Sequence, residues 1–185
     1  YSGASMEETV SGGMVAPIRE MAGQVFAVVF LMSPEPLRLK VIGLLNLLFQ
    51  HDEWETRHGA LLAIKYIVVL MATNTKTPGE KCQWKEHFLV YFVDMVISGL
   101  EDKNDDVQGV ASQILCFSLP YFDTDKEEES IFIPRAIRSL WKSMVNIRVV
   151  SSSINDIVKL LSQIIRTNAM VALHVISNTD SSLHG

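Results

Sequence analysis

Apolar residues recur at steps of three and four along most of this chain, which is the spacing of one face of an α-helix. The two clearest stripes are Leu89, Phe92, Val93, Val96, Ile97 and Leu100, and Val107, Val110, Ala111, Ile114, Leu115 and Ser118. No segment of useful length alternates at a period of two, so we expect an all-α chain.

The same spacing predicts further helices over residues 18–32, 37–49, 54–72, 134–145 and 154–166. Pro17 is expected in the first turn of the first helix, where its missing amide hydrogen costs little. The helix that starts near Trp54 is apolar nearly all round, as expected for a helix inside a stack. Residues 73–80 are predicted to be a loop, and residues 123–130 a charged linker.

Three of these helices repeat one pattern. Aligning Ile18, Thr56 and Val107 also aligns Arg19 with Arg57 and Gln108, Ala22 with Ala60 and Ala111, and Phe26 with Ile64 and Leu115. The first offset, 38 residues, is close to the period of a two-helix repeat, and the second, 51 residues, needs one insertion. The pattern predicts an α-solenoid of HEAT/armadillo-like helical hairpins, whose function lies on an extended surface rather than in an enclosed pocket. The arginines at the repeated position are expected to bond to neighbouring repeats.

The predicted solenoid occupies residues 14–167, as about four helix pairs of which the first lacks its leading helix. Residues 1–13 are expected to be a disordered or truncated N-terminal end, and residues 168–185 a short helix with a flexible tail. The start at Tyr1, within a repeat, suggests a fragment of a longer protein.

Charge narrows the classes of partner. The chain carries a net charge of −5, and residues 101–130 alone hold 9 acidic and 2 basic side chains. Such a segment repels phosphate, which disfavours direct nucleic-acid binding and favours a basic protein partner. No apolar run reaches the roughly 18 residues of a membrane span, so no membrane partner is expected.

Acidic residues cluster in two equivalent turns, each between the two helices of a pair, and equivalent turns of a solenoid lie along one edge. The candidate partner-binding residues are Asp52, Glu53, Trp54, Glu55, Glu101, Asp102, Asp105 and Asp106. A ridge of carboxylates there suits a basic protein surface. Two plainer interpretations stay open: the acids cap helices and aid solubility, and Trp54 packs in its own repeat rather than anchoring a partner.

The sequence gives little support for a catalytic site or a metal site in this chain. The phosphate-binding pattern Gly-x-x-x-x-Gly-Lys-Ser/Thr is absent from the sequence. His58 lies beside Glu55, but no serine or cysteine nucleophile shares the motif, so a structural histidine is expected. Cys82 and Cys116 lack ligand-like spacing, and a reducing, intracellular compartment is favoured. No catalytic residue, metal, cofactor or small-molecule substrate is predicted for this chain.

The aligned motifs match HEAT repeats, and a closer resemblance covers most of residues 14–166. The segment from Trp54 to Tyr66, with the repeats around Arg19 and Val107, resembles the TATA-binding-protein-associated factors whose C-terminal half is a chromatin-remodeller-type ATPase. Gln108 departs from the family pattern, which tends to have arginine there.

The resemblance implies a nuclear, N-terminal solenoid that holds TATA-binding protein, so that an ATPase encoded elsewhere in the polypeptide can remove it from promoter DNA. ATP is then implied for the full-length protein only, and promoter DNA is met only indirectly, through the complex. Two alternatives stay open. One is a HEAT scaffold of another class, for nuclear transport or a phosphatase, and the other is an enzyme with a site in the concave groove.

Overall fold

The computed structural model describes residues 5–74, 85–122, 127–146, 155 and 157–166, and all of its regular elements are helical. They are α1 (Ser5–Met32), α2 (Glu35–Phe49), α3 (Trp54–Asn74), η1 (Phe88–Phe92), α5 (Val93–Leu100), α6 (Asp105–Ser118), η2 (Leu119–Tyr121) and α7 (Glu127–Asn146). Residues 157–166 form one more helix. Within the described ranges there is no β-strand, so the all-α prediction is confirmed.

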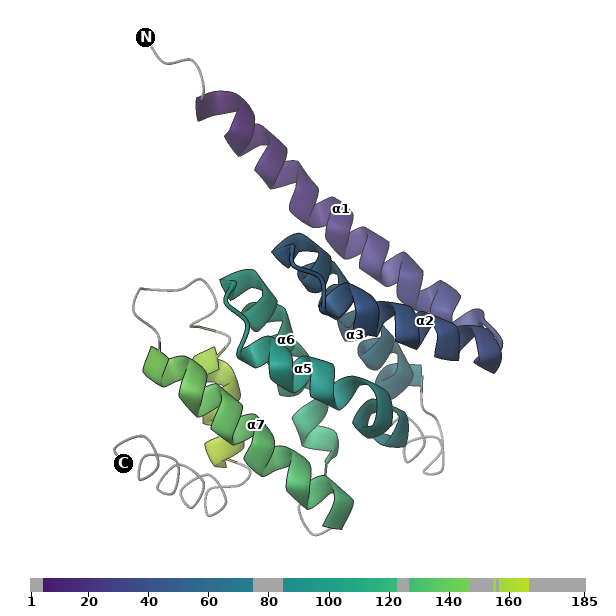
Figure 1. Cartoon of the computed structure of the whole chain (residues 1–185), viewed down its shortest axis with the longest axis vertical. Helices are drawn as coiled ribbons and strands as arrows, with labels where there is room; N and C mark the ends of the chain where they lie inside the picture. The colour runs from purple at the N-terminus through teal and green to yellow at the C-terminus, as the bar shows by residue number, and fades with distance from the viewer. Residues whose placement is uncertain (1–4, 75–84, 123–126, 147–154, 156, 167–185) are drawn as a thin grey trace.

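The helices stack in pairs, one pair after the next (Figure 1). In the pairs α2–α3 and α5–α6, the two helices pack against each other. The second helices form a row, because α3 packs against α1 on one side and α6 on the other. α7 packs on α5, and the helix of residues 157–166 reaches α6 through Gln163, whose Nε2 donates to the carbonyl oxygen of Cys116 at 2.9 Å. The result is an open stack, as expected for a solenoid.

The core follows the predicted apolar stripes. α3 is buried along most of its length, with Leu61, Ile64 and Ile67 fully covered, because it has neighbours on several sides. Every residue of the stripe that begins at Val107 is buried, and so is every residue of the stripe that ends at Leu100 except the half-buried Leu89. The burial of these stripes is the hydrophobic contribution that holds the pairs together.

The first helix is longer than its sequence pattern predicts. α1 begins at Ser5 rather than Ile18, and Pro17 lies inside the helix instead of in its first turn. Residues 5–13, predicted as part of a disordered or truncated end, belong to this helix. A proline removes one backbone hydrogen bond, and a long helix with intact turns on both sides of it tolerates that loss.

The prediction at the other internal proline is wrong for the same reason. α7 begins at Glu127 and continues through Pro134, where the sequence predicts its start. Residues 127–130, predicted as charged linker, are therefore helical and form the first turn of α7. Residues 123–126 lie outside the described part of the chain, as do most of the predicted loop and the tail after residue 166.

A short π-helical segment interrupts the first helix of the third pair. Residues 85–87 are α-helical and lead into η1, which α5 follows without a break. Phe88 of η1 packs against Phe122 and Phe132, with ring centroids 5.6 Å and 5.9 Å away. Phe88 and Phe92, at the two ends of η1, are both buried. As for membranes, none of the helices in the described ranges combines the length and hydropathy that a membrane-spanning helix needs.

Candidate functional site

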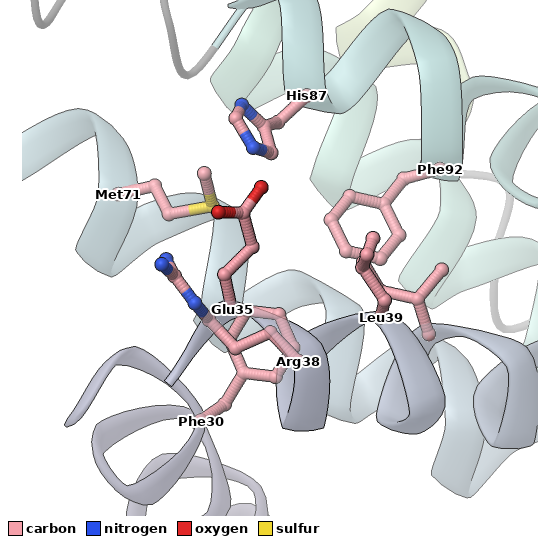
Figure 2. Close-up of a pocket in the computed structure, with 8 residues that line it drawn as sticks. Phe30, Glu35, Arg38, Leu39, Met71, His87 and Phe92 are labelled. Carbon is pink, nitrogen blue, oxygen red and sulfur yellow. The ribbon is translucent and has the colours of Figure 1, made fainter. Parts of the chain in front are cut away.

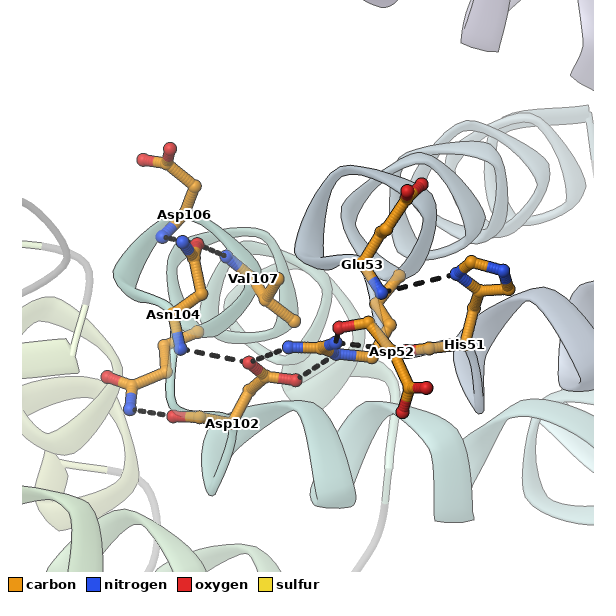
Figure 3. A network of polar contacts seen from close by, with 9 residues as sticks. His51, Asp52, Glu53, Asp102, Asn104, Asp106 and Val107 are labelled. Atoms are coloured by element: carbon orange, nitrogen blue, oxygen red, sulfur yellow. Dashed lines mark hydrogen bonds and ion pairs between the residues drawn. The ribbon is translucent and has the colours of Figure 1, made fainter.

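The two acidic turns lie next to each other because one ion pair joins them (Figure 3). Arg57, in the first turns of α3, donates from Nε to Asp102 Oδ2 at 2.7 Å and from Nη2 to Oδ1 at 2.9 Å. Its Nη1 donates to the carbonyl oxygens of His51 and Asp52, at 2.9 Å and 2.7 Å. One guanidinium thus fixes both its own turn and the turn of the next pair, which confirms the expected bond to a neighbouring repeat.

Electrostatics around this pair favour both charged forms. The hydrogen bond with Asp102 raises the pKa of Arg57 above its ordinary value, against a smaller effect of burial. Burial alone would raise the pKa of Asp102, but hydrogen bonds from Arg57 and from the backbone amide of Asn104 outweigh it and hold that pKa below its usual range. The pair is charged at neutral pH, with 18% and 8% of the two side chains exposed.

Asn104 ends the second turn by capping α6. Its Oδ1 accepts hydrogen bonds from the backbone amides of Asp106 and Val107, at 2.9 Å and 3.3 Å. The backbone amide of Asn104 donates to Asp102 Oδ1 at 2.9 Å. Gln108, at the position where the related repeats carry arginine, donates from Nε2 to the carbonyl oxygen of Asp102 at 2.6 Å. These bonds fix the shape of the turn within its own repeat.

The predicted site residues divide into structural and outward-facing groups. The carboxylate of Asp102 is buried in the ion pair. Glu101 accepts a hydrogen bond from Ser139 Oγ at 2.6 Å and lies 3.6 Å from Lys142 Nζ, so it links this turn to α7. The remaining acids, which we call the acidic turn surface, are Asp52, Glu53, Glu55, Asp105 and Asp106. Asp105 is half-buried and the other four are exposed.

Trp54 and His58 belong to the packing between the first two repeats. The half-buried ring of Trp54 lies edge-on to His58, with centroids 6.1 Å apart, and packs on the core. Arg19 of α1 places its guanidinium carbon 5.8 Å from the centroid of the Trp54 ring, so it contacts the neighbouring repeat through a cation–π interaction rather than an ion pair. Burial lowers the pKa of His58, and its Nδ1 has no hydrogen-bond partner. The contact of the His58 ring with Trp54, together with its burial, indicates a packing role.

A shallow pocket between the second and third pairs lies apart from these turns. Its cavity volume is about 20 Å³, which is room for about one water molecule rather than for a small-molecule ligand. Its lining residues are Phe30, Glu35, Arg38, Leu39, Ile42, Met71, His87 and Phe92 (Figure 2). None of them is a predicted site residue, and no short motif could identify them, because α1, α2, α3 and the helix around η1 each contribute. Over the described ranges, no three histidines, cysteines or acids come together to hold a metal ion.

Comparison with known proteins gives consistent relatives. The chain is 32% identical over 159 residues to TATA-binding protein-associated factor 172 of Homo sapiens, an alignment that covers 84% of this chain. It is 28% identical over 155 residues to TATA-binding protein-associated factor BTAF1 of Arabidopsis thaliana, and 28% identical over 176 residues to TATA-binding protein-associated factor mot1 of Schizosaccharomyces pombe, covering 84% and 90% of this chain. The chain spans only 7–8% of the length of these relatives. No protein-family model and no solved structure matches it. These relatives, together with the stacked helical fold, show that the chain belongs to the TATA-binding-protein-associated factor family.

Proposed function

We propose that this chain is a scaffold segment that binds TATA-binding protein. The relatives that it matches are all named for association with that protein, and they cover most of the chain. The observation that carries the proposal within the chain is the acidic turn surface, which two adjacent repeats present together because Arg57 and Asp102 join their turns.

The chemistry of such a surface suits a DNA-binding partner. Proteins that bind the DNA backbone must present a basic surface, and an acidic surface on the scaffold is complementary to it. The five side chains of the acidic turn surface come from turns whose backbone is fixed by hydrogen bonds. Little backbone conformational entropy is therefore lost when the partner binds. Long-range attraction between the two surfaces increases the rate of encounter.

In this proposal the chain holds its partner and does not hydrolyse ATP. The sequence contains no Gly-x-x-x-x-Gly-Lys-Ser/Thr pattern to cradle phosphates. Hydrolysis and the removal of TATA-binding protein from promoter DNA belong to other parts of a longer nuclear polypeptide, and this chain meets DNA only through the complex.

The test is capture of purified TATA-binding protein by a double charge reversal, Glu53→Lys with Asp106→Lys. Both side chains are exposed, lie at helix N-termini and belong to the acidic turn surface. The matched control is Glu35→Lys with Asp94→Lys, two exposed acids in the first turns of α2 and α5, which changes the net charge equally. Because Asp94 forms an ion pair with Arg135 at 2.6 Å, the melting temperature of the control is compared with that of the wild type. Asp102 is left intact because its replacement would disturb the fold rather than the surface.

We expect the reversal in the turns to slow association by about tenfold at low salt and to flatten its salt dependence, since rim charges act mainly on the rate of encounter. The control should keep most of the wild-type rate. Equal losses in the two variants would mean that only net charge matters. A wild-type chain that fails to capture TATA-binding protein would overturn the proposal itself.

A further inference from the structure

The small pocket beside α2 has both apolar and polar walls (Figure 2). Its apolar walls are Phe30, Leu39, Ile42, Met71 and Phe92. Its polar walls are the side chains of Glu35, Arg38 and His87. A cavity volume of about 20 Å³ excludes a cofactor or a metabolite, so only a species as small as a water molecule fits.

One of the side chains that line this pocket carries a buried donor. Arg38 as a residue is half-buried, but its Nε atom is covered from solvent and has no hydrogen-bond partner among the described residues. An arginine guanidinium stays protonated in proteins, so this N–H group is a permanent donor. Buried polar groups nearly always have a partner, either in the protein or in an ordered water molecule. An acceptor from outside the described side chains is therefore expected at this atom.

The start of α2 places an acceptor near this donor. Glu35 and Arg38 are three residues apart, so they lie on the same face of the first turn of α2. That turn is fixed by Pro34, whose carbonyl oxygen accepts from the backbone amides of Leu37 and Arg38 at 3.0 Å and 3.1 Å. Figure 2 shows the Glu35 side chain extending from this turn towards the ring of His87. The pocket wall thus offers a guanidinium, a carboxylate and an imidazole, and a buried water needs two to four polar partners.

The two charges of the pocket decide which small species fits. The guanidinium of Arg38 disfavours a metal cation, and only one carboxylate lines the pocket. The carboxylate of Glu35 disfavours an anion such as chloride. Water is neutral, has the right size, and can both accept and donate hydrogen bonds. An empty cavity is disfavoured as well, because cavities that stay dry have apolar walls throughout.

We propose that the pocket is a binding site for one ordered water molecule, which accepts the Nε–H of Arg38 and donates to the carboxylate of Glu35. His87, the residue before η1, lines the same pocket from the third helix pair. The water therefore lies between the second and third pairs. It satisfies the buried arginine donor and is a fixed part of the structure, as buried waters commonly are.

The place of the pocket in the fold gives this water a role in the joint between two pairs. The third and fourth pairs meet through their first helices, because α7 packs on α5. Between the second and third pairs, the packing of the first helices is weaker over the described residues, and α3 and α6 make most of the contact. The pocket lies on the weaker side of that joint, next to α2. The water supplies polar contacts there, where side-chain packing is incomplete.

Rotating-frame Overhauser measurements on the chain test the water directly, because they separate dipolar contact with water from proton exchange by sign. Arg57 is the matched control, since its Nε donates to Asp102 Oδ2 at 2.7 Å and so has a protein acceptor. We expect a dipolar cross-peak to water from the Nε–H of Arg38 and none from that of Arg57. The absence of a cross-peak from Arg38 would overturn the proposal.

A high-resolution crystal structure of the chain supplies a second readout. The water oxygen should lie within about 3.2 Å of Arg38 Nε and of a Glu35 carboxylate oxygen. Electron density for a chloride ion at this place, or a direct bond from Arg38 Nε to a protein oxygen, would contradict the proposal.

A pair of variants tests the same site through stability. Arg38→Met removes the donor and keeps an unbranched side chain, and Lys40→Met removes the same charge from an exposed position of α2. If a water partners Arg38, the substitution takes a bond from that water, and the melting temperature should fall about 2 °C below that of Lys40→Met. If Arg38 Nε has no partner, its removal relieves the cost of a buried donor and should raise the melting temperature instead. A melting temperature equal to or above that of the control would therefore overturn the proposal.

Discussion

Arg57 and Asp102 are 45 residues apart in the sequence, and their side chains form a two-point ion pair between consecutive repeats. The arginine comes from the repeated position that first marks the solenoid in the sequence. The aspartate comes from a turn with several acids, and the sequence pattern does not distinguish one of these acids from another. Because the planar guanidinium also binds two carbonyl oxygens of its own turn, it fixes the spacing of both turns at once.

Replacing Asp102 should be costly for stability. Asp102→Asn leaves the half-buried Arg57 charge without its charged partner, and we expect it to lower the free energy of unfolding by about 2 kcal/mol. Asp105→Asn, in the same turn but outside the ion pair, should change it by less than about 0.5 kcal/mol. Urea denaturation of both variants measures the difference. Equal losses would show that the ion pair contributes no more than a helix-terminal charge.

The cap of α6 gives a second stability prediction. Asn104→Ala removes the acceptor for two backbone amides, so we expect a loss of about 1 kcal/mol. Asn104→Asp keeps an oxygen in the same place and should retain most of the stability. Thermal unfolding followed by circular dichroism at 222 nm measures both variants, with that wavelength chosen for its helix signal. If the aspartate variant loses as much as the alanine variant, the cap is not the reason.

The sequence predicts the helices and their buried faces well because both depend on short-range spacing. The stripe that begins at Val107 is buried in every member, and the repeat alignment identifies Arg57 correctly as a residue that bonds to the next repeat. Spacing cannot show which acid receives that bond. The sequence pattern therefore groups Asp102 with the surface acids, although only 8% of its side chain is exposed.

The errors at helix ends have a different origin. Pro17 and Pro134 are both interior residues, although proline commonly marks a first turn. A proline removes one backbone hydrogen bond, and the intact turns on both sides of it decide whether the helix continues. The sequence pattern does not predict the π-helical turn at η1 either, because no local motif marks it.

His58 predicts a pH dependence of stability. Its folded pKa lies below the ordinary value of 6.5 because burial disfavours the charged ring. The unfolded chain therefore binds more protons, and the free energy of unfolding should decrease as the pH falls from about 7.5 through the unfolded pKa towards the lower folded one.

The residues around His58 modulate this effect without reversing it. Asp106 and Glu20 favour the charged ring, and Arg19 and Lys65 disfavour it. His58→Phe keeps an aromatic ring beside Trp54 but removes the titration, so its urea midpoint should vary less over the same pH range. An unchanged pH dependence in the variant would assign the effect to other groups.

Two helical glycines, Gly99 of α5 and Gly43 of α2, should respond oppositely to alanine. A Cβ at Gly99 would lie 2.8 Å from Leu61 Cδ1 and 3.0 Å from Ala111 Cβ, where α5 crosses α6 and approaches α3. The methyl of Ala111 cannot rotate away, so Gly99→Ala must separate the helices, and we expect a net loss of about 1–3 kcal/mol. Gly43 lies on α2 with no atom within 4 Å of such a Cβ. There the gain in helix propensity should stabilise the chain by about 0.5–1 kcal/mol. Urea denaturation of the two single variants checks both signs, and a stabilised Gly99→Ala chain would show that the α5–α6 contact is not closely packed.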